Sequence, residues 1–69
     1  MDFGKNLKLL RIQRTLSQEE LGRLTNLSQP AINKFELNKI NPKPETIAAL
    51  ADALNVTTDR LILGDQKGE

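Results

Sequence analysis

The sequence contains no cysteine and no histidine, and two phenylalanines are its only aromatic residues. Without cysteine the chain has neither a disulfide framework nor a thiolate metal site. Without histidine it lacks the commonest metal ligand and the usual general base of an enzyme. Two phenylalanines do not provide a stacking platform for single-stranded nucleic acid. We therefore expect no metal, no other cofactor and no enzymatic activity.

The chain also lacks an apolar run long enough to cross a membrane, and it opens on Met-Asp-Phe-Gly-Lys, without the apolar core of a signal peptide. Valine, isoleucine and threonine do not alternate with polar residues as strands require. Sixty-nine residues make one domain, near the lower limit for an unaided hydrophobic core. These features predict a soluble, cytoplasmic, all-α domain over residues 1–69, with no membrane partner and no evident small-molecule ligand.

A net charge of only +1 conceals an uneven distribution along the chain. Residues 1–43 carry eight basic and four acidic side chains, which gives a net charge of +4. Residues 44–69 carry two basic and five acidic side chains, which gives −3. A domain with this polarity favours a polyanion on one side only.

The polar residues of the basic half predict two short helices joined by a tight turn. Ser17 and Glu20 have the spacing of a capping box, which marks the start of the first helix. Asn26 tolerates left-handed backbone angles and can therefore end that helix and turn the chain. Ser28 caps the second helix, and Pro30 suits its first turn. Two helices joined in this way predict a helix-turn-helix.

The apolar residues of the two helices predict which faces are buried. Leu21 and Leu24 lie three apart on one face of the first helix, and Ile32 and Phe35 point inward from the second. Gly22 costs about 1 kcal/mol relative to alanine inside a helix. We therefore expect a packing reason for it, namely another helix that crosses very close.

The opposite face of the second helix carries two amides and an ammonium, which are groups that read base edges or hold phosphates. Its members are Gln29, Pro30, Asn33 and Lys34. Most polar helix faces are simply solvated, and the face alone favours that interpretation. The turn and the glycine shift the balance towards binding.

Three further helices are predicted, over residues 3–14, 45–54 and 59–63. Of Leu9 and Ile12 in the first, at least one is expected to be partly exposed, whereas Leu16 after it is expected to be buried. A polar loop over residues 37–44 contains Leu37 and Ile40, of which one is expected to pack on the core. The segment 65–69 is expected to be a frayed tail.

Five short motifs together resemble the phage repressor and Cro-type (Xre-like) helix-turn-helix family. They are Leu-Ser-Gln-Glu-Glu-Leu from residue 16, Asn-Leu-Ser from 26, Ile-Asn-Lys-Phe-Glu from 32, Asn-Pro from 41 and Leu-Ala-Asp-Ala-Leu-Asn-Val from 50. The resemblance covers residues 3–65. It implies a lambda-repressor-like bundle of five short helices in which the second and third form the helix-turn-helix. The implied function is a sequence-specific regulator of double-stranded DNA, with repression as its expected mode.

The resemblance also implies roles for single residues. The base-reading set comprises Gln29, Pro30, Asn33 and Lys34, in which Gln29 would contact adenine. The set that contacts the DNA backbone comprises Gln18, Ser28, Asn38, Lys39 and Lys43, in which Gln18 would hold a phosphate through its side chain and helix amides and also brace Gln29. Arg11 and Glu36 would form a structural ion pair.

Members of this family bind palindromic operators as two-fold dimers, with the third helix in the major groove. The surface that would form the dimer comprises Val56, Asp59, Arg60 and Leu63. Two alternatives remain open: an antitoxin or protein-interaction module of the same fold, and the N-terminal DNA-binding fragment of a longer repressor.

Overall fold

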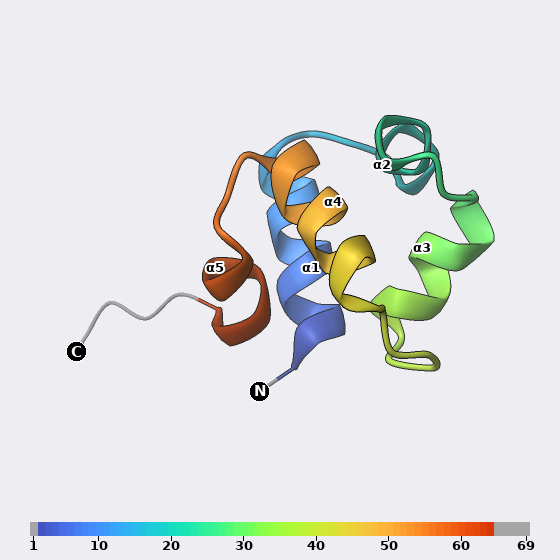
Figure 1. Cartoon of the computed structure of the whole chain (residues 1–69). Coiled ribbons are helices and arrows are strands. Elements are labelled where there is room, and N and C mark those ends of the chain that lie inside the picture. The colour runs from blue at the N-terminus through green and yellow to red at the C-terminus, as the bar shows by residue number, and fades with distance from the viewer. Residues whose placement is uncertain (1, 65–69) are drawn as a thin grey trace.

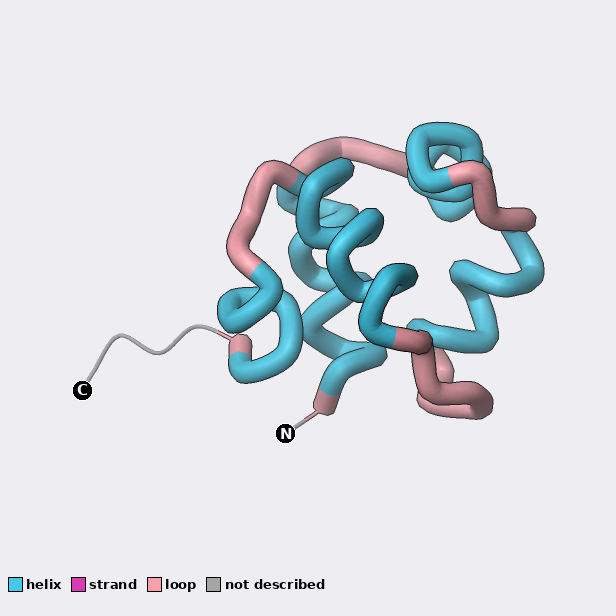
Figure 2. Tube along the Cα trace, in the orientation of Figure 1, coloured by secondary structure: helices cyan, strands magenta, loops and turns pink. Residues whose placement is uncertain are grey.

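Five helices follow one another through short connections in the computed structural model, which describes residues 2–64 (Figure 1). They are α1 (Phe3–Gln13), α2 (Gln18–Thr25), α3 (Gln29–Glu36), α4 (Pro44–Leu54) and α5 (Thr58–Leu63). Within these residues the chain forms no strand (Figure 2), so the all-α prediction is confirmed. The predicted frayed tail lies outside the described residues. None of the five helices has the length and apolarity to cross a membrane.

Short polar side chains begin four of the five helices. Asp2, Ser17, Ser28 and Thr57 each accept a hydrogen bond from the backbone amide three residues later. At α2 the bond is reciprocal, because the Glu20 carboxylate accepts from the Ser17 amide at 2.7 Å. This backbone hydrogen bond lowers the pKa of Glu20 below its ordinary value of 4.5. The predicted capping box is therefore confirmed.

Four helix ends share one closure, and none of them uses glycine. Their left-handed residues are Thr15, Asn26, Asn38 and Asn55, with φ between 57° and 61°. In each case the next residue donates its amide to the carbonyl five positions earlier, which completes the Schellman motif. Of the three asparagines, Asn26 was predicted to adopt these angles. Thr15 was not, because a β-branched residue is a poor choice for left-handed angles.

The core is a single hydrophobic cluster to which all five helices contribute. Leu7, Leu21, Ile32, Leu50, Leu54 and Leu61 are fully buried. α1 packs against α3 and α5, α2 packs against α3 and α4, and α4 packs against α5. The α2–α3 pair therefore packs on a scaffold made by the other three helices (Figure 1).

Two glycines mark close approaches of the backbone. A Cβ on Gly22 would lie 2.5 Å from the carbonyl oxygen of Leu27. The close neighbour of Gly22 is therefore the turn between α2 and α3, whereas the sequence predicted a crossing helix there. The close helix crossing occurs at Gly4 instead. A Cβ there would lie 2.7 Å from the Phe35 carbonyl oxygen and closer still to that of Glu36. Gly4 thus lets α1 meet the end of α3.

Several apolar residues lie further out than predicted. Leu24 is 62% exposed, so it does not share the buried face of Leu21. Leu37 and Ile40 are 54% and 44% exposed, and neither packs on the core as one of them was expected to do. Leu16 is only partly buried, although it packs against the core cluster.

One side chain of α1 and one from the residue that follows it bind the ends of later helices. The Asn6 side-chain nitrogen donates to the carbonyls of Leu61 and Ile62 in α5, at 3.2 and 3.1 Å. The Arg14 Nε donates to the Leu54 carbonyl at the end of α4, at 2.8 Å. These bonds satisfy carbonyls that a helix end leaves without an intrahelical partner.

Candidate nucleic-acid interface

A buried ion pair joins α1 to the end of α3. The Nε of Arg11 lies 2.6 Å from Oε2 of Glu36, and the two side chains are 12% and 3% exposed. The other guanidinium nitrogens donate to Oε1 of Glu36 at 3.2 Å and to the Leu16 carbonyl at 2.8 Å. The structure thus brings together the two residues that the sequence paired.

Gln18, the first residue of α2, connects this ion pair to two other polar side chains of α3. Its Nε2 donates to Oε1 of Glu36 at 2.9 Å and to Oδ1 of Asn33 at 3.2 Å. Its Oε1 accepts from Nε2 of Gln29 at 2.6 Å. Five side chains from three helices therefore form one polar network, and Gln29 is its exposed end.

This arrangement changes what Gln18 can offer to a phosphate. Both hydrogens of its side-chain amide are donated inside the protein, so a phosphate contact through this side chain would require one of them to change partner. The bracing contact to Gln29 is present. The backbone amides of Gln18 and Glu19 have no acceptor within residues 2–64, because they belong to the first turn of α2.

The predicted base-reading face divides into exposed and half-buried members. Gln29, Pro30 and Lys34 are exposed on α3, whereas Asn33 is half-buried and faces Gln18 in α2. The Ser28 hydroxyl caps α3 by accepting from the Ala31 amide at 3.2 Å. The exposed face of α3 therefore offers one amide and one pyrrolidine ring in its first turn and one ammonium in its last turn.

Asn38, which was predicted to contact phosphate, binds the start of α1 in this structure. Its Oδ1 accepts from the Gly4 amide at 3.0 Å, and its Nδ2 donates to the Asp2 carboxylate at 2.7 Å. The pKa of Asp2 lies below its ordinary value, first because of the backbone hydrogen bond from Lys5 and then because of Asn38. This long-range contact was not predicted from the sequence.

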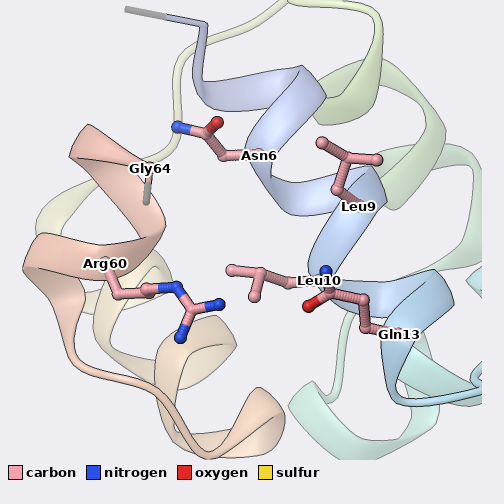
Figure 3. Close-up of a pocket in the computed structure, with 6 residues that line it drawn as sticks. All are labelled: Asn6, Leu9, Leu10, Gln13, Arg60 and Gly64. Carbon is pink, nitrogen blue, oxygen red and sulfur yellow. The ribbon is translucent and has the colours of Figure 1, made fainter. Parts of the chain in front are cut away.

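The remaining predicted cations and the α5 surface lie at the exterior. Lys39 and Lys43 are exposed in the connection from α3 to α4. Of the predicted dimer surface, Asp59, Arg60 and Leu63 are exposed, whereas Val56 is half-buried against the core. Arg60 reaches from α5 over a small hollow of about 80 Å³ beside α1 (Figure 3). That hollow is lined by Asn6, Leu9, Leu10, Gln13, Arg60 and Gly64.

Several proteins that are similar to this chain in sequence are named as transcriptional regulators or repressors. The sequence model of a helix-turn-helix family matches residues 7–61. The chain is 33% identical to the HTH-type transcriptional activator BcrR of Enterococcus faecalis over 66 residues, which are 96% of this chain and 32% of that protein. It spans about a third to just over half of the length of the first curated relatives.

Two solved structures share the fold over nearly the whole chain. The P22 c2 repressor in complex with a synthetic operator has a TM-score of 0.87 at 29% identity, covering 94% of this chain and 98% of that one. The restriction-modification controller protein C.AhdI of Aeromonas hydrophila has a TM-score of 0.85 at 33% identity, covering 87% and 91%. The predicted lambda-repressor-like arrangement is confirmed. The chain belongs to the helix-turn-helix family, in its Xre-like, phage-repressor branch.

Proposed function

We propose that this chain is a sequence-specific regulator of transcription, acting as a repressor, that places α3 in the major groove of double-stranded DNA. The supporting observation is the state of Gln29. One hydrogen of its amide is used on Gln18, while its Oε1 and the second hydrogen are available on the exposed start of α3. An acceptor beside a donor matches N6–H and N7 of adenine.

Three exposed lysines follow this reading group along the chain. Lys34 lies on α3, and Lys39 and Lys43 follow it in the exposed connection. They would anchor the DNA backbone together with Ser28 and the free amides at the start of α2, and these contacts would fix the register without reading sequence. Asn38 is left out of this set, because its side chain is committed to α1.

On α3 itself, Lys34 would contact guanine or a phosphate one turn beyond Gln29. Pro30 would make apolar contact with a thymine methyl group. The names of the relatives support regulation, and the P22 c2 structure supports DNA as the ligand.

We also propose that two copies bind a palindrome, with half-sites about 34 Å apart. The contact surface would be Val56, Asp59, Arg60 and Leu63 around α5. Half-burial of Val56 in its own core leaves the three exposed residues as the larger contributors.

The test is selection of bound duplexes from a random library at roughly physiological salt, with the wild type, Gln29→Ala and Gln13→Ala. Gln13 is a matched control, because it is an exposed glutamine of α1 beside α5. We expect a palindrome in which Gln29→Ala alone relaxes one symmetric pair of positions, by about 1–3 kcal/mol. Salt-labile binding with no enriched sequence would instead favour the protein-interaction module.

A further inference from the structure

We infer that Asn33 is a positioning residue, which fixes the orientation of the Gln18 amide and through it the atoms that Gln29 presents to a base. This inference rests on the proposed function and deepens it, because it states why adenine would be preferred over guanine. It also replaces the sequence-based expectation that Asn33 reads a base directly.

The orientation of the Gln18 amide follows from the chemistry of its neighbours. The Glu36 carboxylate only accepts hydrogen bonds, so the group that faces it at 2.9 Å has to be the nitrogen of Gln18. The second hydrogen of this nitrogen goes to Oδ1 of Asn33 at 3.2 Å. With its nitrogen held by two acceptors, Gln18 turns its oxygen towards Gln29.

The orientation of Gln29 then follows from that of Gln18. Since an oxygen faces it at 2.6 Å, Gln29 gives one Nε2 hydrogen to Gln18 and keeps an acceptor and one donor for the groove. With the Gln18 amide reversed, Gln29 would give up its oxygen and present two donors. Two donors match the N7 and O6 acceptors of guanine.

Asn33 is well placed for this task and poorly placed for reading. It lies one turn after Gln29 on α3, is half-buried, and directs its oxygen to α2, whereas Lys34 beside it is exposed. Glu36 shares the task, but it also holds Arg11, so its substitution would disturb the fold as well. Asn33 is therefore the member of the network that can be changed alone.

The experiment compares Asn33→Leu, which has a similar shape and no acceptor, with Asn33→Asp, which keeps an acceptor. Binding is measured on operators that differ only at the base pair identified with Gln29→Ala. We expect Asn33→Leu to lose about 3- to 10-fold of the preference for adenine over guanine. Asn33→Asp should weaken binding to both operators equally, through its charge, and keep the preference. Asn33→Ala provides a second variant without the acceptor.

Two further measurements separate this inference from its alternatives. Gln29→Ala combined with Asn33→Leu should show no more loss at this base pair than Gln29→Ala alone. In the free protein, the side-chain amide hydrogens of Gln18 should exchange with solvent faster in Asn33→Leu than in the wild type. Thermal unfolding confirms that each variant is folded.

Three outcomes would overturn the inference. Relaxation of a different base pair by Asn33→Leu, additive with Gln29→Ala, would make Asn33 a direct reader. Unchanged preferences in Asn33→Leu and Asn33→Ala would leave Asn33 without influence on Gln29. A wild type that selects no sequence would overturn the proposed function and this inference together. Failure of this inference alone would leave the effect of Gln29→Ala on base preference in place.

Discussion

Removal of Arg11 should destabilise this domain more than any surface substitution, because it leaves a carboxylate buried without its cation. In Arg11→Met the Glu36 side chain, 3% exposed, would lose its two bonds to the guanidinium and keep one from Gln18. Breaking a buried pair in this way costs about 3–5 kcal/mol. A domain of this length has a free energy of unfolding of about 3–10 kcal/mol, so a large share of the stability would be lost.

The assay is urea unfolding followed by circular dichroism, with a matched control and a rescue. Arg23→Met is the control, because its ion pair with Glu19 spans 3.7 Å between side chains that are 67% and 76% exposed. Such a pair contributes about 0–1 kcal/mol. Arg11→Met combined with Glu36→Met should recover most of the loss, since it removes the stranded charge.

Either of two results would refute this reasoning. One is a cost of Arg11→Met no larger than that of Arg23→Met. The other is a double variant that is no more stable than Arg11→Met alone, which would mean that the loss comes from the contacts of the arginine and not from the buried charge of Glu36.

Three smaller effects follow from local features. Thr15→Gly should raise the free energy of unfolding by about 0.5–1 kcal/mol, because it relieves a left-handed threonine. Asn55→Gly should raise it less in the same urea titration, and an equal increase would count against this explanation. Gly4→Ala should cost about 1–3 kcal/mol by urea unfolding, since its Cβ meets backbone oxygens of α3, and an unchanged midpoint would show that α1 can shift freely. The pKa of Glu20 is lowered in the folded state, so its contribution to stability is present above its ordinary pKa of 4.5 and lost as the pH falls below it. Unfolding curves at pH 7 and 3 should therefore differ less for Glu20→Gln than for the wild type, and an equal difference would exclude the capping carboxylate as a source of acid sensitivity.

Local features of this fold could be predicted from the sequence because they depend on neighbouring residues. Ser17 and Glu20 satisfy each other's amides within one turn, and Asn26 and Asn55 adopt angles that few other residues tolerate. The buried positions of Ile32 and Phe35 follow from helical spacing alone.

Features that depend on the approach of distant segments could not be predicted. Nothing near Gly4 in the sequence indicates that the end of α3 passes against it, or that Asn38 reaches back to its amide. For the same reason Asn33 was assigned to the outward face. Its position on α3 is compatible with solvent, and only the placement of Gln18 turns it inward. Helical spacing also placed Leu24 beside Leu21, but within residues 2–64 no other helix covers that position.

The bonds from Asn6 to the last turn of α5 have a consequence for synthesis. They join residues 55 and 56 positions apart, and the fully buried Leu61 comes from the same helix. While the ribosome adds roughly 5–20 residues each second, α1 lacks this partner until α5 has emerged from the exit tunnel. We therefore expect this domain to remain unfolded until α5 has emerged and then to complete its core in one late step.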